Sequence, residues 1–300
     1  MTFLQDWMIP SMLMDKDKIM PKGISIHIAL EHFDPNEYGG NKGRLLGCKK
    51  DMQDMEKIAI YQEFDSIQLL LNEDATRDNV VNAITSASSS LKSGDILFLT
   101  YSGHGTFFED EDGDEDIDSE EEKAHDEAWC LYDGFLLDDE LHYFWTLFED
   151  GVRIFMISDS CHSGTMNKDV FNENLPIEKS FSKDEALNLY LKRKEYYDDI
   201  KERASMAKDK EIKSTVLLIA GCEDDESSHI FPPYENSILT LFLNEVWSNG
   251  AFEGTTVEFF DEVKERVVAK ASKKKRYQTP KLSVIGKENI AFSEQKPFVI

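Results

Sequence analysis

The chain has 300 residues, of which 41% are apolar and 11% aromatic. This composition supports a large buried core and excludes an intrinsically disordered protein. With 33 basic and 59 acidic residues, the formal charge is −26. Such a charge repels nucleic acid and anionic membranes and attracts cationic partners, such as calcium or Lys/Arg-rich peptides. It also serves plain solubility, and composition alone leaves both roles open.

The amino-terminal segment and the spacing of the cysteines bear on the cellular compartment that we expect. Residues 1–22 are interpreted as an N-terminal extension without an uninterrupted apolar stretch or a small-residue cleavage site. No segment is apolar for long enough to span a bilayer. The four cysteines are far apart in the sequence and form no C-x-x-C pair, namely Cys48, Cys130, Cys161 and Cys222. Free thiols are typical of a reducing compartment, so we expect a cytoplasmic monomer with no membrane or nucleic-acid partner.

The first part of the chain alternates strand and helix patterns. Residues 23–30 alternate apolar with small or polar side chains, which predicts a strand, and His27 is expected to pack inside it rather than bind a ligand. After a Gly/Asn-rich loop, residues 45–61 have the apolar spacing of a helix. Residues 67–71 predict a second strand. Residues 77–91 predict a helix, which a glycine closes.

Three nearly continuous apolar runs, residues 96–101, 153–158 and 216–220, have the pattern of strands that are buried on both faces of a parallel sheet. Strands that alternate with helices in this way predict an α/β fold around a mostly parallel sheet. With no internal repeat and no second composition regime, residues 23–300 are predicted to form one domain.

Two stretches interrupt this alternation. Residues 109–122 are too charged to pack and are expected to form a solvated acidic loop. Residues 168–213 are rich in Lys, Glu and Tyr with good helix formers, so they predict an inserted helix or a linker.

Reactive side chains follow two of the buried strands. His104 stands in Tyr-Ser-Gly-His-Gly after the first, and Cys161 in Asp-Ser-Cys-His-Ser-Gly after the second. Loops at the carboxyl ends of parallel strands face one cleft, where a thiolate can attack and an imidazole can move the proton. The backbone N–H groups of Gly105 and Cys161 would stabilise an oxyanion. His162 is next to the nucleophile and should point away from it, so it is assigned a structural role.

These two segments resemble the two catalytic motifs of metacaspases, including their bacterial relatives. Further matches are residues 23–30 as the first strand, Leu-Gly-Cys-Lys-Lys-Asp at 46–51, and Gln-Thr-Pro-Lys-Leu at 278–282. The animal caspase sequence Q-A-C-x-G is absent, which disfavours cleavage after aspartate. The resemblance implies a caspase-like α/β/α sandwich. It also implies a cysteine endopeptidase that works through a thioester acyl-enzyme without a redox or organic cofactor.

The resemblance further implies protein or peptide substrates that are cleaved after Arg or Lys. By position, the specificity pocket of the family maps to Cys48, Asp51, Ser102 and Asp159. Independently, a pair of carboxylates in a cleft selects a guanidinium or ammonium group through charge-assisted hydrogen bonds. The alternative is that Asp51 is an exposed helix residue and Asp159 a turn former.

Many metacaspases require calcium, which carboxylates hold outside the active site. Asp126 and the pair Asp138 and Asp139 match three of those ligand positions, and clustered carboxylates suit a hard cation. At the fourth position Lys168 falls in line, and Asp169 would substitute only after a shift of one residue. Helix capping explains the adjacent pair almost as well. Calcium as an activator is therefore a hypothesis.

Two other interpretations stay open. One is an inactive caspase-like scaffold, which the presence of both reactive residues disfavours. The other is a different Cys–His peptidase of the caspase fold, related to legumain, separase or gingipain. Peptides with Arg, Lys, Asn or Asp before the scissile bond would separate them.

Self-cleavage is a further hypothesis, because residues 168–213 contain basic residues that match the expected specificity. The candidates are Lys192, Arg193, Lys194, Arg203 and Lys213. The helix formers around them oppose it, because a peptidase cleaves an extended backbone.

Overall fold

The computed structural model describes residues 20–109, 125–161, 177–223, 226–232 and 235–300. Its centre is a six-stranded sheet. The strands of this sheet are β1 (Gly23–Ala29), β2 (Ser66–Leu71), β3 (Ile96–Ser102), β7 (Arg153–Asp159), β9 (Thr215–Ala220) and β11 (Lys281–Gly286).

The sheet has the order β11-β9-β7-β3-β1-β2, and each neighbouring pair is parallel except β11 with β9. All seven residues of β3 are buried, as expected for a strand covered on both faces. At the two edges, β2 and β11 have exposed side chains among half-buried ones. The longest apolar runs therefore lie in the middle of the sheet, and their carboxyl ends lie side by side.

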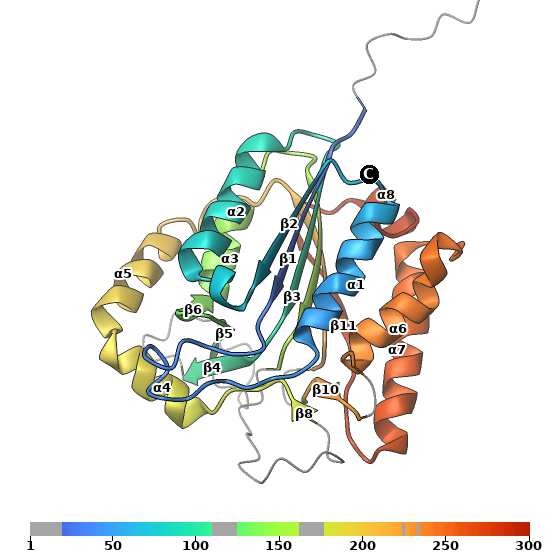
Figure 1. Cartoon of the computed structure of the whole chain (residues 1–300). Coiled ribbons are helices and arrows are strands. Elements are labelled where there is room, and N and C mark those ends of the chain that lie inside the picture. Colours follow the sequence, from blue (N-terminus) through green and yellow to red (C-terminus); the bar gives the residue numbers. More distant parts are fainter. Residues whose placement is uncertain (1–19, 110–124, 162–176, 224–225, 233–234) are drawn as a thin grey trace, which may run out of the picture.

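Helices cover both faces of the sheet (Figure 1). They are α1 (Cys48–Tyr61), α2 (Arg77–Ser90), α3 (Asp138–Trp145), α4 (Lys183–Lys192), α5 (Lys194–Ser205), α6 (Ile238–Trp247), α7 (Thr256–Lys273) and α8 (Ile290–Glu294). One apolar core joins α2 and α3 to the first face, and a second core joins α1, α6 and α7 to the other. The result is a three-layer α/β/α sandwich, as predicted.

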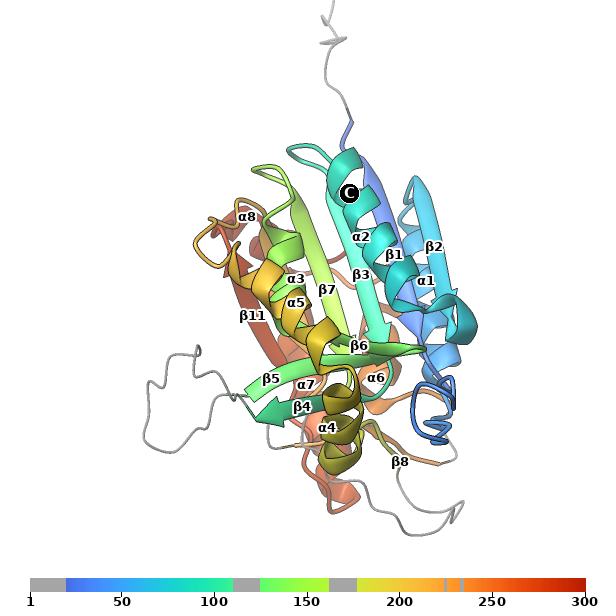
Figure 2. The same cartoon turned by 90° about the vertical axis from the view of Figure 1, so that its left-hand side faces the viewer.

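A second sheet lies across the carboxyl end of the central one (Figure 2). It consists of β4 (Gly105–Glu109), β5 (His125–Leu131) and β6 (Gly134–Leu137) in antiparallel order. A two-stranded ladder pairs β8 (Ile177–Glu178) with β10 (His229–Ile230). Because β4 starts three residues after β3 ends, this second sheet forms part of the surroundings of the predicted reactive loops.

The elements predicted in chain order are present. The helix predicted from residue 45 begins only at Cys48, because Gly47 has a positive φ of 99° that a helix does not allow. His27 is packed as expected, with Nδ1 2.9 Å from Thr100 Oγ1, and burial lowers its pKa to about 3. Among the described residues, no helix has the length and apolar character needed to cross a bilayer.

The two interrupting stretches are described only in part. The acidic loop lies outside the described residues except for Glu109, where β4 ends, and residues 1–19 of the N-terminal extension lie outside as well. Within residues 168–213, α4 and α5 provide the expected helices. The small sheet was not predicted, because β4 and β5 mix charged, polar and apolar residues without a clear period and β6 has only four residues.

One buried ion pair joins α2 to α3. The Arg77 guanidinium contacts both carboxylate oxygens of Glu140, at 2.7 and 3.0 Å, and both side chains are less than a tenth exposed. Arg77 also donates to the Phe135 carbonyl in β6. This one side chain therefore connects the helix layer to the second sheet.

We expect Arg77→Ala to lower the free energy of unfolding by about 3–5 kcal/mol, because Glu140 would stay buried without its partner. The control is Arg266→Ala, which removes half-exposed pairs with Glu262 in α7 and Glu245 in α6 and should cost less than about 1 kcal/mol. Urea unfolding followed by circular dichroism measures both. Equal losses in the two variants would contradict the assignment.

Candidate active site

The two predicted reactive residues follow neighbouring strands. Ser102, the last residue of β3, is in register with Asp159, the last residue of β7. His104 and Cys161 each lie two residues further along, and both are buried. The parallel pairing of β3 with β7 therefore brings the two loops together at one end of the sheet.

Two aromatic side chains support the backbone of the loop that contains His104. Tyr101 lies flat on Trp129, with ring centroids 4.3 Å apart. Its hydroxyl donates to the carbonyls of His104 and Cys130, at 2.7 and 3.0 Å. Trp129 donates to Ser158 Oγ at 2.9 Å, which connects this support to β7. The backbone of His104 is therefore fixed between the central sheet and the second sheet.

Beside these loops lies an acidic cluster, defined here as Asp51, Ser102 and Asp159. Ser102 Oγ lies 2.8 Å from Asp51 Oδ2, and both carboxylates are about 1% exposed. Cys48 is one turn before Asp51 on α1 and is also buried. Burial raises the pKa of the Cys48 thiol to about 12, so this thiol is neutral. Asp51 is thus not an exposed helix residue, and that alternative is wrong.

Two serines that the sequence analysis missed complete the hydrogen bonding of the cluster. The hydroxyls of Ser228 and Ser237 donate to opposite oxygens of Asp159. The backbone N–H of Ser237, at the N-terminus of α6, donates to Asp51 Oδ1 at 3.0 Å. Ser237 therefore links the two carboxylates, and Ser228 adds a second neutral donor to Asp159.

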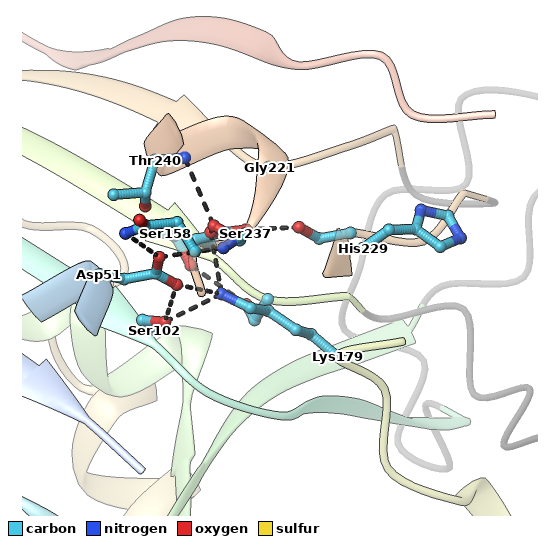
Figure 3. Close-up of polar contacts among 12 residues, drawn as sticks. Asp51, Ser102, Ser158, Lys179, Gly221, His229, Ser237 and Thr240 are labelled. Atoms are coloured by element: carbon cyan, nitrogen blue, oxygen red, sulfur yellow. Dashed lines mark hydrogen bonds and ion pairs between the residues drawn. The ribbon is translucent and has the colours of Figure 1, made fainter. Parts of the chain in front are cut away.

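The side chain of Lys179 ends inside the acidic cluster (Figure 3). Its Nζ lies 2.9 Å from Asp51 Oδ2, from Asp159 Oδ2 and from Ser102 Oγ. The side chain is 0% exposed. Burial alone would lower the pKa of Lys179, but the carboxylates of Asp159 and Asp51 outweigh it and raise the pKa. Lys179 is therefore a charged ammonium group that is bound by two carboxylates.

The main chain of Lys179 contacts the reactive loops. Its carbonyl oxygen accepts hydrogen bonds from the N–H groups of Gly105, at 3.0 Å, and Cys161, at 3.2 Å. These are the two N–H groups that the sequence analysis named as oxyanion donors. The N–H of Lys179 donates to the Ser228 carbonyl at 3.1 Å. Side chain, carbonyl and amide of this one residue are thus all bound at the same site.

The residues on either side of Lys179 pair with the walls of the site. Before it, β8 runs antiparallel to β10. After it, Ser180 bridges to Gly105, and the N–H of Phe181 donates to the Gly105 carbonyl at 2.7 Å. Gly105 therefore binds the backbone on both sides of the Lys179–Ser180 peptide bond.

The two reactive side chains differ in their contacts. Cys161 Sγ accepts a hydrogen bond from the Ser228 N–H at 2.6 Å. Burial lowers the pKa of His104 to about 4, against a smaller opposite effect from the backbone of Gly43 and Ser180. Among the described residues, the buried Nδ1 of His104 has no hydrogen-bond partner. The imidazole is therefore neutral near pH 7 and can accept a proton.

The proposed calcium ligands are described only in part. Asp138 and Asp139 form the first turn of α3, and Asp139 lies 3.8 Å from the Lys208 ammonium. Asp126 belongs to β5, but its side chain, like Lys168, Asp169 and also His162, lies outside the described residues. Within the described ranges, no three His, Cys, Asp or Glu side chains group as metal ligands.

Seven of the residues predicted from the sequence lie at one site in the structure, and Lys179 was not among the predicted residues. Those seven are Cys48, Asp51, Ser102, His104, Gly105, Asp159 and Cys161. Lys179 lies among many lysines in residues 168–213, and no local pattern distinguishes it. Ser228 and Ser237 follow β9 in a stretch without apolar periodicity. One available signal for a lysine at this site was that a pair of buried carboxylates requires a cation.

The part of the chain that holds His104 and Cys161 matches a known family. A family model described as metacaspase, peptidase C14 domain, matches residues 36–169. Metacaspase-1 of Pyricularia oryzae is 37% identical over 43% of this chain and 34% of that protein. Metacaspase-6 of Arabidopsis thaliana is 32% identical over 42% of this chain and 36% of that protein. The chain thus spans about a third of the length of these curated relatives.

Two solved structures match almost the whole chain. A protein from Geobacter sulfurreducens superposes with a TM-score of 0.77 at 35% identity, covering 93% of this chain and 99% of that one. Caspase-1 from Spodoptera frugiperda superposes with a TM-score of 0.54 at 13% identity, covering 88% and 86%. The second likeness is one of fold, and it confirms the predicted caspase-like architecture.

The family model and the curated relatives agree with the two motifs at the strand ends, and the Geobacter sulfurreducens protein is related over its full length. Over residues 36–169 the chain is thus similar to the metacaspase family of cysteine peptidases.

Proposed function

We propose that this chain is a cysteine endopeptidase that hydrolyses peptide bonds after Lys or Arg, with Cys161 as nucleophile and His104 as acid and base. The observation that carries the proposal is Lys179. Its ammonium contacts Asp51 and Asp159, and its carbonyl oxygen accepts hydrogen bonds from two backbone N–H groups. This is the arrangement that a basic residue before a scissile bond would adopt.

The chemistry follows from these contacts. The Cys161 thiol transfers its proton to the neutral His104, and the thiolate attacks the carbonyl carbon of the basic residue. The N–H groups of Gly105 and Cys161 stabilise the negative charge on the carbonyl oxygen. The C–N bond then breaks and His104 protonates the leaving amine. Water, activated by His104, hydrolyses the thioester and releases the acid and the free thiol.

Electrostatics supports selection of a basic side chain. With Lys179 in place, one positive charge faces the two carboxylates of the acidic cluster. A neutral side chain would leave both carboxylates buried without a cation, which costs several kcal/mol. An arginine would suit the same acceptors, because its guanidinium carries more donors than an ammonium group. The serines that contact Asp159 would lessen the repulsion but cannot neutralise it.

The same contacts support self-cleavage at the Lys179–Ser180 bond as part of this proposal. Of the five candidates predicted from the sequence, Lys192, Lys194 and Arg203 lie in α4 and α5, where the helical backbone opposes cleavage. Arg193 lies between these two helices, and Lys213 lies before β9. Lys179 instead lies in a segment that pairs with other strands on both sides. Until that bond is cut, the segment would occupy the site and block other substrates.

Catalysis is tested by substitution of the reactive residues. Cys161→Ala and His104→Ala should each reduce hydrolysis of Lys and Arg peptides to background, while far-UV circular dichroism stays unchanged. His162→Ala should retain most of the activity. Greater damage from His162→Ala than from His104→Ala would refute the assignment of the base, and a wild-type chain without activity would favour an inactive scaffold.

Specificity is tested by substitution of one carboxylate. Asp159→Asn should reduce cleavage after Arg by about 10- to 150-fold, because it loses a charge-assisted contact of about 1.5–3 kcal/mol. Internally quenched peptides with Arg, Lys, Gln, Asn or Asp before the bond measure this. An unchanged rate on Arg peptides would remove Asp159 from the specificity site.

Self-cleavage is tested by sequencing the new amino terminus of the wild-type chain, which should begin Ser-Phe-Ser-Lys at Ser180. Lys179→Arg should preserve the cut and Lys179→Gln should prevent it, as should Cys161→Ala. Lys192→Gln serves as the matched control, because this lysine is exposed on α4, and it should change nothing. A first new terminus at another position would contradict the assignment.

Calcium belongs to the proposal as an activator, with no role in the reaction steps. Peptide hydrolysis should rise when millimolar calcium is added and fall when a chelator removes it. Asp138→Asn combined with Asp139→Asn should reduce this response, and magnesium is the control ion. Equal activity with calcium and with chelator would exclude a calcium requirement.

A further inference from the structure

Phe181 lies two residues after the carbonyl of Lys179, and its side chain is buried at the part of the apolar core formed by two aromatic rings. Its ring meets Phe33 and Tyr38 edge to face, with centroid distances of 5.6 Å to each. Phe33 and Tyr38 themselves stack at 4.1 Å, and we call them the aromatic pair. The backbone of Phe181 is fixed at the same time by its hydrogen bond to Gly105.

The aromatic pair is built by elements other than the segment it receives. The Tyr38 hydroxyl donates to the carbonyls of Leu131 and Gly134, at 2.6 and 2.9 Å. Phe33 packs over Gly43, where a Cβ would lie 2.0 Å from the ring and where φ is +52°. Both side chains therefore have contacts to the loop after β1 and to the second sheet in addition to those with Phe181.

The aromatic pair is also continuous with the reactive site. The ring of Phe33 lies 5.5 Å from that of His104, and the ring of Phe181 lies 6.5 Å from it. His104 is the group that would protonate the leaving amine. A side chain bound by the aromatic pair therefore belongs to the leaving half of the substrate and lies next to the acid that releases it.

We propose that Phe33 and Tyr38 form a binding subsite for the second residue after the scissile bond, and that this subsite selects an aromatic side chain. The inference rests on the proposed function and deepens it. The preferred substrate is a peptide with a basic residue, one small residue and an aromatic residue in sequence, as in Lys179-Ser180-Phe181. Edge-to-face contacts between aromatic rings contribute binding energy in addition to the burial of apolar area. An aromatic side chain should therefore bind to this pair more tightly than an aliphatic one.

The contact acts on one step of the reaction. The leaving half departs when the acyl-enzyme forms, so its binding energy can accelerate acylation but not hydrolysis of the thioester. The preference should therefore appear in kcat/KM, and it should be absent from the rate at which a preformed acyl-enzyme is hydrolysed.

The test uses internally quenched peptides Ile-Glu-Lys-Ser-X-Ser with X as Phe, Tyr, Leu or Ala, and enzyme that has completed self-cleavage. We expect kcat/KM to follow the order Phe and Tyr, then Leu, then Ala, with at least a tenfold difference between Phe and Ala. In Phe33→Leu the ratio of Phe to Ala should shrink to about twofold. Taking the ratio within each enzyme cancels changes in the reactivity of His104.

A parallel peptide with Gln in place of Lys separates the two proposals. Equal cleavage of the Phe and Ala peptides, with the Lys requirement intact, would overturn the aromatic subsite and leave the proposed function standing. It would mean that Phe181 stays packed as a core residue. Equal cleavage of the Lys and Gln peptides would overturn the proposed function, and so would a failure to cleave any of the peptides. Either result would also overturn this inference, because it rests on the proposed function.

Discussion

The site depends on the contact between one ammonium group and two buried carboxylates. Asp51 comes from α1, Asp159 from β7, and Lys179 from a segment that follows them in the chain. A buried ion group of this kind contributes little net stability but becomes very costly when one member is removed. The positions of α1, β7 and the segment 177–181 therefore depend on one another, because each contributes a charged member of this ion group. Any cation that replaces Lys179 must lie at the same position and donate hydrogen bonds to the same carboxylates.

Gly105 connects the central sheet to this arrangement. Its N–H binds the carbonyl of Lys179 and its own carbonyl binds the N–H of Phe181. Since Gly105 is also the first residue of β4, the second sheet determines where the backbone of a bound segment lies. The small sheet is consequently one side of the site, and the stacked rings of Trp129 in β5 and Tyr101 in β3 support the backbone of His104.

The sequence was informative where periodicity and strand ends carry the signal. The buried runs at 96–101 and 153–158 predicted strands of a mostly parallel sheet, so the loops with His104 and Cys161 were expected to face one cleft. That the two strands are neighbours is seen only in the structure. The acidic cluster came from a family resemblance, and no periodicity would have found it. Lys179 and Phe181 could not be predicted, because their positions depend on tertiary pairing of residues 177–181 with β10 and Gly105. Ser228 and Ser237 escaped for the same reason.

The strand order has a consequence for any chain that is cut between β7 and β9. Strand β9 pairs with β7 on one side and with β11 on the other, so the two fragments would share one continuous sheet and both apolar cores. Fragment complementation would hold them together as a heterodimer with the native shape. Size-exclusion chromatography would not detect the cut, whereas denaturing electrophoresis would. Refolding would then require two fragments to associate, so the midpoint of thermal unfolding would depend on protein concentration.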